Sequence, residues 1–388
     1  MIKHVSTVEL TEEQKMLQDT VRSYMDKNVK PIVGEYEQKK EFPFELFKEL
    51  HKFGYVGGIL PEEDGGMGLK FEHQAILMQE AGRVWGSLRA LSNTLMMFCV
   101  ALSTFGTKEQ KEKYLKPVLA CEKPRLFIAI TEPNHGSNVA GMETTAVEDG
   151  DGYVINGSKM FITNGSIADY GILVAKTESR EKEKEFTAFI IDPEISKYQA
   201  HNMEKLFIRA TKTSVLHFDD MWVPKENVLG GVGNGLKIGL KSLNFGRLNV
   251  AMGCVGIAIA SLEDSIEYVQ QRKQFGRIIG SFQMVQDMIV QMLALTESSR
   301  LLGLKAAKVL DQGLRGEIEC SVAKLVASEN AFQVANMALQ VHGGNGYMEE
   351  FPIERYFRDA RGTMIPEGTS QIQKLIIGRE LLGMSAFL

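Results

Sequence analysis

Along this 388-residue chain the spacing of apolar residues changes twice, from a helical period to a strand-like one and back. Few folds combine their elements in that order. From Thr11 to about residue 120, apolar residues recur every three or four positions, which is typical of amphipathic helices. From 126 to about 224, β-branched and aromatic runs alternate with Gly, Asp and Asn turns, as in strands. After GGVGNG (residues 230–235) the helical period returns and continues. The sequence therefore predicts an α+β fold in the order helices, β domain, helices.

Local signals support these zones and place their boundaries. Thr11 and Gln14 fit a capping box, which predicts a helix start. DGDG at residues 149–152 predicts a hairpin turn. In the last zone one helical stripe is expected from Val255, Ile259, Leu262, Ile266 and Val269. We expect domains at 1–122, 123–232 and 233–388.

Composition excludes several classes of protein. A net charge of -5 and a pI near 5.9 argue against nucleic-acid binding. The four cysteines lack a CxxC and the seven histidines lack an H-E-x-x-H, so neither disulfides nor a metal site is expected. The charged start lacks an apolar signal segment, and no run of about 18 apolar residues is found. We expect no membrane span, and a cytoplasmic chain of bacterial type or a mature mitochondrial matrix chain.

Two glycine-rich stretches invite a nucleotide-binding interpretation. GGVGNG does not fit GxGxxG and lacks an alternating βαβ context, so it is interpreted as a linker. HGGNGY (342–347) lacks the P-loop lysine. It remains either a turn between helices or a close backbone approach to a ligand phosphate.

The stretch TMIPEGTSQIQKL (363–375) holds the carboxylate of Glu367 between Pro366 and Gly368. Proline fixes its own φ and glycine permits unusual backbone angles, so the turn is expected to be stiff and sharp. Ser370 and Gln373 fit a second capping box, with a helix beginning near residue 371. Local evidence leaves two interpretations open: an acid that complements the helix dipole, or a carboxylate aimed for chemistry.

Taken together, five stretches in order resemble the acyl-CoA dehydrogenase family: ITEPNHGSNV, INGSKMFITNG, QQRKQFGRIIGSFQMVQ, QVHGGNGYMEEFPIERYFRDAR and PEGTSQIQKLIIGREL. The resemblance implies an N-terminal helical domain, a middle β-barrel or sandwich and a C-terminal four-helix bundle. It also implies FAD held between the β domain and the bundle. A homotetramer built as a dimer of dimers, an acyl-CoA substrate and electron-transfer flavoprotein as acceptor are expected as well.

The same resemblance implies that Glu367 is the base that removes the α-proton of the thioester while flavin N5 takes the β-hydride. Its backbone N–H and a ribityl hydroxyl of FAD would meet the developing enolate charge. Some relatives carry the base immediately before an arginine that matches Arg247, but this chain has Gly246 there. Pro366 and the segment FIRATKTS (207–214) depart from the family pattern, which leaves the acyl group open.

Further site residues follow from the resemblance alone. FAD contacts are implied from the β domain (Ile130, Thr131, Gly136, Ser137, Phe161, Thr163), from the bundle of a neighbouring subunit (Arg272, Phe275, Gln283, Gln340, Gly344) and after the base (Thr369, Gln371). Phe161 stands where a tryptophan is common. Substrate contacts are implied for Arg247, Ser137, Asn244 and Gly368.

Arg89, in GSLRALSNTL, has two open interpretations. It could be a solvated or paired surface arginine, because exposed arginines are common. In the glutaryl-CoA dehydrogenase branch, which IIGRELLG also resembles, an arginine in this segment binds the free carboxylate of the substrate. Arg89 would then select a dicarboxylic monothioester rather than a simple or ring-bearing acyl-CoA. An oxygen-using member of the family and a non-catalytic flavoprotein scaffold are the disfavoured alternatives.

Overall fold

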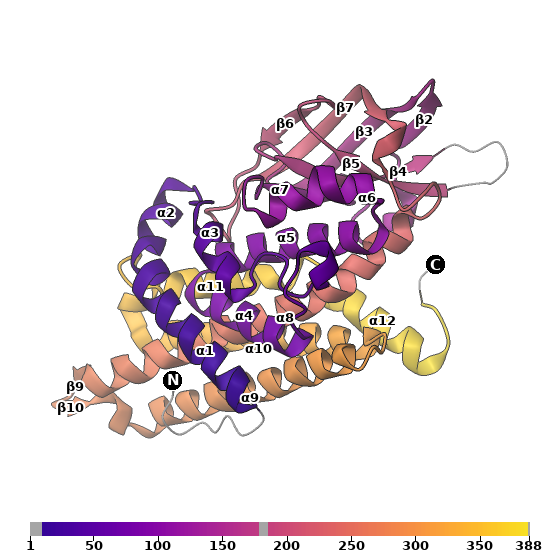
Figure 1. The fold of residues 1–388 in the computed structure, drawn as a ribbon. Coiled ribbons are helices and arrows are strands. Elements are labelled where there is room, and N and C mark those ends of the chain that lie inside the picture. Colours follow the sequence, from indigo (N-terminus) through magenta and orange to yellow (C-terminus); the bar gives the residue numbers. More distant parts are fainter. Residues whose placement is uncertain (1–9, 178–184, 387–388) are drawn as a thin grey trace.

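A computed structural model describes residues 10–177 and 185–386. Its first part is helical, as the apolar spacing predicts (Figure 1). The predicted capping box is confirmed: Gln14 N–H donates to Thr11 Oγ1 (3.2 Å), and Thr11 N–H donates to Gln14 Oε1 (3.0 Å). The helices of this part are α1 (Glu12–Tyr24), α2 (Val33–Lys39), α3 (Leu46–Leu50), α4 (Phe71–Val84), α5 (Gly86–Phe105), α6 (Lys108–Gln110) and α7 (Lys116–Leu119).

The middle part forms one eight-stranded sheet in the order β6-β7-β3-β2-β4-β5-β8, with β1 parallel to β4. The DGDG hairpin is confirmed, because Asp149 pairs with Gly152 and Gly150 takes a φ of 59°. Two strands were not predicted, β6 and β8, which are short and lie at the ends of the sheet order. The strands are β1 (Leu126–Ala129), β2 (Thr145–Asp149), β3 (Gly152–Thr163), β4 (Tyr170–Thr177), β5 (Glu185–Ile191), β6 (Gln199–Asn202), β7 (Thr213–Pro224) and β8 (Val228–Leu229).

The last part is the predicted helical bundle, in which α10 packs against α8, α9 and α12. HGGNGY lies largely in a short 3₁₀ turn, η9 (Gly343–Tyr347), between two helices. GGVGNG connects β8 to α8, as expected of a linker. The elements are α8 (Gly235–Gln271), the hairpin strands β9 (Lys273–Gln274) and β10 (Arg277–Ile278), α9 (Gln283–Asp311), α10 (Glu317–His342), α11 (Ile353–Thr363) and α12 (Ser370–Leu382).

The middle of helix α8 is buried on every side, so the predicted stripe is only part of its buried surface. All residues from 246 to 262 are buried. The reason is the close crossing of α4: a Cβ placed on Gly82 would lie 2.2 Å from the Gly253 carbonyl oxygen, and one on Gly256 would lie 2.0 Å from that of Gln79. Glycine therefore lets the N-terminal helices join the bundle, and one apolar core runs through both parts.

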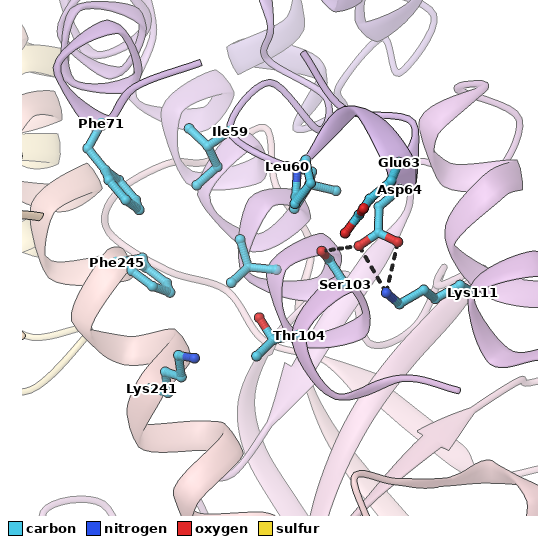
Figure 2. A pocket seen from close by; sticks show the side chains of 12 residues that line it. Ile59, Leu60, Glu63, Asp64, Phe71, Ser103, Thr104, Lys111, Lys241 and Phe245 are labelled. Carbon is cyan, nitrogen blue, oxygen red and sulfur yellow. Dashed lines mark hydrogen bonds and ion pairs between the residues drawn. The ribbon is translucent and has the colours of Figure 1, made fainter. Parts of the chain in front are cut away.

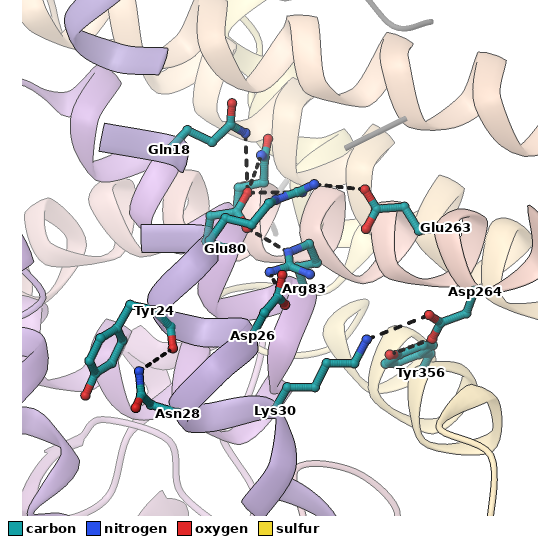
Figure 3. Close-up of polar contacts among 12 residues, drawn as sticks. Gln18, Tyr24, Asp26, Asn28, Lys30, Glu80, Arg83, Glu263, Asp264 and Tyr356 are labelled. Atoms are coloured by element: carbon teal, nitrogen blue, oxygen red, sulfur yellow. Dashed lines mark hydrogen bonds and ion pairs between the residues drawn. The ribbon is translucent and has the colours of Figure 1, made fainter. Parts of the chain in front are cut away.

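A buried cluster of charges links the same elements (Figure 3). Glu80 accepts hydrogen bonds from Arg22 (3.1 Å) and Arg83 (2.7 Å), and Arg22 also pairs with Glu263 on α8 (2.9 Å). Burial raises the pKa of Glu80, but the two guanidinium groups outweigh it and hold the pKa below its usual range. The cluster ties α1 and α4 to α8.

Two helices, α5 and α8, are long and apolar enough to cross a membrane by length and composition. Neither contains an unbroken run of about 18 apolar residues, because polar residues are scattered through both helices. Within the fold, 78% of the apolar window of α5 and 94% of that of α8 are buried. Their composition is that of core helices.

Candidate active site

Glu367 lies in the turn between α11 and α12, and its own backbone is left-handed with a φ of 59°. Non-glycine residues in this region are uncommon and are held there by their surroundings. Gln373 Nε2 donates to the carbonyl oxygens of Glu367 (2.9 Å) and Gly368 (3.0 Å), and Lys324 Nζ donates to Gly368 (2.9 Å). The predicted stiff turn is therefore held from two helices.

The predicted cap of the following helix is wrong by one residue. Thr369, not Ser370, is the N-cap, since its hydroxyl accepts from the N–H of Ile372 (3.3 Å) and α12 begins at Ser370. Gln373 does not close a capping box, because its amide holds the Glu367 turn instead. The hydroxyl of Thr369, predicted to contact FAD, thus also caps a helix.

The two oxygens of the Glu367 carboxylate have different surroundings. Oε1 accepts a hydrogen bond from Asn93 Nδ2 on α5 (3.2 Å). Oε2 is buried and has no hydrogen-bond partner among the described residues. A Cβ on Gly246 would lie 2.6 Å from Oε2, so a larger residue there would take the space of this oxygen. The carboxylate leaves one oxygen free to accept a proton.

Buried positive charge surrounds this carboxylate. Burial raises the pKa of Glu367, and Arg247, Arg89, Lys324 and the Asn93 bond oppose that shift without cancelling it. Burial in turn lowers the pKa of Lys324 to about 8 and lowers those of both arginines. A carboxyl group whose pKa is raised in this way, and which can still ionise, has the properties of a general base.

The structure brings Arg247 and Asn244, both on α8, toward the same region. Arg247 is buried, and its Nε has no partner in the part of the chain that the structure describes. Asn244 donates its amide to the carbonyl oxygen of Arg315 (2.7 Å), while its Oδ1 is buried and unbonded. Each therefore retains a polar atom for a ligand.

Arg89 is not a surface residue. It is only 3% exposed, and its Nε lacks a hydrogen-bond partner among residues 10–177 and 185–386. Burial lowers its pKa, and Cys254, Glu367 and Asp359 oppose that shift, but neither carboxylate forms an ion pair with Arg89. Arg89 precedes Asn93 by four residues of α5, about 6 Å of helix rise. The guanidinium thus lies near the base but pairs with no carboxylate among the described residues.

The predicted FAD residues of the β domain gather at one edge of the sheet. Ile130 and Thr131 follow β1, and the carbonyl of Thr131 accepts from the N–H of Met160 in β3 (2.8 Å). Phe161 and Thr163 end that strand, and Phe161 is 59% exposed with a φ of 63°. Gly136 and Ser137 lie exposed in the loop before β2, and a Cβ on Gly136 would meet nothing within 4 Å. An open aromatic face and an open loop are compatible with a large flat cofactor.

The predicted FAD residues of the bundle form a separate, distant group. Phe275 lies in the β9–β10 hairpin, is 92% exposed and has a φ of 51°. Arg272 caps the end of α8, roughly 37 Å along the helix from Arg247. Figure 1 shows this hairpin and α12 at opposite ends of the bundle. A single chain therefore does not bring the two groups of predicted FAD residues together. This separation is expected if a neighbouring subunit completes the site. The remaining members, Gln283, Gln340 and Gly344, are also exposed.

One group of ligand-type side chains, Glu132, His135 and Glu143, comes close enough to suggest a metal. However, Glu132 is already used: it accepts from Lys159 Nζ (2.8 Å) and from the N–H groups of Glu143 (2.6 Å) and Thr144 (3.0 Å). These bonds hold the loop that carries Ser137. All four cysteines are free and buried, as predicted.

A cavity of about 300 Å³ lies elsewhere, between α5, α8 and the 59–64 loop (Figure 2). Its walls include Phe71, Phe245 and Lys241, and at its rim Asp64 binds Lys111 (2.8 Å) and Ser103. None of the predicted site residues lines it. Glu367 is not among its lining residues.

Three residues of the Glu367 site were missed in the sequence: Asn93, Lys324 and Gln373. A signal existed for two of them. Asn93 is a polar residue four positions after Arg89 in an otherwise apolar helix, and Lys324 is a lone charge in the small, apolar run SVAKLVAS. Buried polar residues in such runs need partners, which points to a site.

Family models match the chain in three consecutive parts. They are described as acyl-CoA dehydrogenase N-terminal domain (residues 11–122), middle domain (128–221) and C-terminal domain (233–382). The matches cover most of the chain in the order of its three structural parts. They do not test the domain boundaries predicted above, which stay predictions.

Curated relatives match over nearly their whole length. A short-chain-specific acyl-CoA dehydrogenase of Clostridium acetobutylicum is 38% identical over 96% of this chain and 98% of its own. The CarC subunit of the caffeyl-CoA reductase-Etf complex of Acetobacterium woodii is 38% identical over 96% and 99%. A glutaryl-CoA dehydrogenase of Desulfococcus multivorans is 38% identical over 97% and 98%.

Solved structures agree with this likeness. Butyryl-CoA dehydrogenase from Megasphaera elsdenii superposes with a TM-score of 0.91 at 34% identity, covering 96% of this chain and 99% of its own. A glutaryl-CoA dehydrogenase bound to glutaryl-CoA gives 0.92 at 36% identity, covering 96% of each chain. A glutaryl-CoA dehydrogenase from Mycobacterium smegmatis in complex with FADH2 gives 0.91 at 29% identity, covering 98% and 97%.

Proposed function

Because this chain belongs to the acyl-CoA dehydrogenase family of FAD-dependent oxidoreductases, we propose that it converts an acyl-CoA thioester to the 2-enoyl-CoA with Glu367 as the base. The observation that carries this proposal is the buried, unbonded Oε2 of Glu367 in a rigid turn among three cations. Proton abstraction needs a positioned base whose pKa is raised toward the working pH, and Glu367 meets both conditions.

The residues of this chain have distinct parts in the reaction. Glu367 Oε2 takes the α-proton of the thioester. Its backbone N–H makes no hydrogen bond within the described residues, so it is free to donate to the thioester oxygen as negative charge develops there. Arg247 supplies a buried positive charge for the CoA arm. Bound FAD supplies the acceptor for the β-hydrogen, which leaves as hydride.

FAD would be held by residues of two subunits. Thr131, Phe161 and Thr163 would hold the flavin from the β domain, while Arg272 at the end of α8 and Phe275 in the hairpin would serve the FAD of a neighbour. The separation of the two groups supports a homotetramer in which subunits complete each other's sites. Electron-transfer flavoprotein is the proposed acceptor, which the relative named as a subunit of an Etf complex supports.

We expect Glu367→Gln to retain FAD and CoA-ester binding but to lose at least about a thousandfold in turnover, because the general base is removed from an intact site. Dye-coupled turnover and anaerobic bleaching of the flavin with a panel of acyl-CoA esters measure this. The matched control is Glu380→Gln, an exposed acid on α12. Near-normal turnover of Glu367→Gln would mean that another residue is the base.

A specific observation favours a dicarboxylic monothioester, of the glutaryl-CoA kind, as substrate. Arg89 is a buried guanidinium with no anion close enough to pair with it in the described chain, and burying an unpaired charge is costly. An anion brought by the substrate would complete the pair. Arginine suits this role because its planar fork binds a carboxylate bidentately.

The matching test compares two substrates on one variant. Arg89→Ala should lower kcat/KM for glutaryl-CoA by about 30-fold or more, since a desolvated arginine–carboxylate pair contributes about 2 to 4 kcal/mol. Butyryl-CoA, which lacks the second carboxylate, should be affected little. Equal losses of kcat/KM on both substrates would contradict a dicarboxylic substrate. A simple or ring-bearing acyl-CoA would then be the better proposal.

A further inference from the structure

Two buried asparagines from different helices form a chain of hydrogen bonds that ends on the base. Asn249 on α8 donates its Nδ2 to Asn93 Oδ1 on α5 (3.0 Å), and Asn93 donates its Nδ2 to Glu367 Oε1 (3.2 Å). Their exposed fractions are 1% and 3%. Burying polar amides is costly unless they are bonded, so this arrangement needs an explanation beyond packing.

The bond from Asn249 decides which end of the Asn93 amide faces the base. An asparagine side chain offers an acceptor at one end and a donor at the other. If the Asn93 amide were inverted, its NH₂ would meet the NH₂ of Asn249, and its oxygen would meet the carboxylate oxygen. Both contacts are repulsive while Glu367 is ionised. With the Asn249 amide as it lies in this structure, its donor and the carboxylate both favour the orientation that places the Asn93 donor on Glu367.

The consequence concerns the two oxygens of the base. Oε1 is held by Asn93, whereas Oε2 is unbonded and points at the space above Gly246. A carboxylate without this bond could rotate about its last torsion and present either oxygen. Holding one oxygen restricts the proton-accepting geometry to the other.

Building on the proposed function, we propose that Asn93, oriented by Asn249, is a positioning residue that holds Glu367 through Oε1 and reserves Oε2 to accept the α-proton. Asn93 also donates to the ionised form of the carboxylate, so its removal disfavours that form. The pair thereby couples α5 and α8 to the turn that precedes α12.

Asn93→Leu tests the positioning, because it removes the donor at similar volume. We expect kcat to fall about 10- to 100-fold with FAD content and KM little changed, and the acid limb of the kcat profile to move to higher pH. Asn249→Leu removes the donor that orients Asn93 without adding a charge, and it should move the limb in the same direction. Thr94→Val, the neighbour whose hydroxyl bonds Ala90, is the matched control.

A double variant separates orientation from packing. If Asn249 acts through Asn93, then Asn93→Leu/Asn249→Leu should be no slower than Asn93→Leu alone, whereas independent packing losses would add. The infrared difference spectrum of wild type minus Glu367→Gln, recorded against pH without substrate, follows the ionisation of the Glu367 carboxyl directly. In Asn93→Leu this ionisation should show the same shift to higher pH. FAD content and melting temperature identify any variant that fails to fold.

The outcomes are distinguishable. An unmoved acid limb in both Asn93→Leu and Asn249→Leu, or additive losses in the double variant, overturns the positioning role while Glu367→Gln remains inactive. An active Glu367→Gln overturns the proposed base and the positioning role together.

Discussion

The ionisation of Glu367 sets when the site can work. Burial raises the pKa of its carboxyl above the usual range, against the opposing effect of Arg247, Arg89 and Lys324. A base must be ionised to accept a proton, so activity should be present above this raised pKa and lost as the pH falls through it. The surrounding cations oppose the upward shift of that acid limb.

Replacement of one of these cations tests the balance. Lys324→Met removes a positive charge near Glu367, so the pKa of the carboxyl should rise further and the acid limb of kcat/KM should move upward by about one pH unit. The variant also loses the hydrogen bond to the Gly368 carbonyl, which should lower the plateau of kcat. The pH profile measures both effects. Lys374→Met, an exposed lysine on α12, is the control, and an identical limb in the two variants would contradict the electrostatic role of Lys324.

The crossing of α4 and α8 decides how the site is assembled, because these helices bring the N-terminal part onto the bundle. Gly82 and Gly256 lie where the two backbones touch, and a Cβ on either would overlap a carbonyl oxygen of the other helix. Such overlap cannot be relieved by a side-chain rotation. The site residues Asn93 and Arg247 depend on this spacing.

Gly256→Ala should therefore lower the free energy of unfolding by about 1 to 3 kcal/mol, the usual cost of overpacking a core. Gly378→Ala is the matched change in an open position, since a Cβ there meets nothing within 4 Å. It should stabilise α12 by about 0.5 to 1 kcal/mol, because alanine favours helix over glycine. Chemical denaturation, monitored by circular dichroism, compares the stability of the two variants. A Gly256→Ala variant as stable as Gly378→Ala would mean that the helices separate easily.

Across the whole molecule, two buried carboxylates join all three parts of the chain. Glu37 on α2 accepts from Trp85 (2.8 Å), Ser87 (2.9 Å) and the N–H of Ala210 (3.3 Å). Asp359 on α11 accepts from the N–H of Ile208 (2.8 Å), whose φ of 46° is unusual for a β-branched residue. The segment FIRATKTS, which departs from the family pattern, is thus held from both helical parts.

This junction predicts a pH dependence of stability. Burial and the neighbouring Glu37 raise the pKa of Asp359 to about 6. An unfolded aspartate ionises near pH 4, so between about pH 4 and 6 the folded protein binds more protons and stability falls as the pH rises. Asp359→Asn retains an oxygen for Ile208 and should flatten this decline and raise the melting temperature at pH 8. Asp219→Asn, an exposed change on β7, should leave the pH dependence as in wild type. An unaltered decline of stability with pH in Asp359→Asn would mean that another group causes it.

Features that depend on neighbours in the chain could be read from the sequence. The order of the three parts, the Thr11 cap, the DGDG hairpin and the rigid turn at Glu367 all follow from residues within a few positions of one another, where backbone sterics and local hydrogen bonds act. The assignments of FAD and substrate residues came from motifs, and most of them remain predictions.

Contacts between distant residues depended on packing. The bond from Asn93 to Glu367 joins positions 274 residues apart, and the bond from Asn249 to Asn93 spans 156. Three further features likewise follow from which helices meet: the burial of the middle of α8 on every side, the lack of a carboxylate paired with Arg89 among the described residues, and the shift of the cap to Thr369. No local pattern encodes these contacts, because the free energy of a buried polar group depends on the partners that the folded chain brings to it.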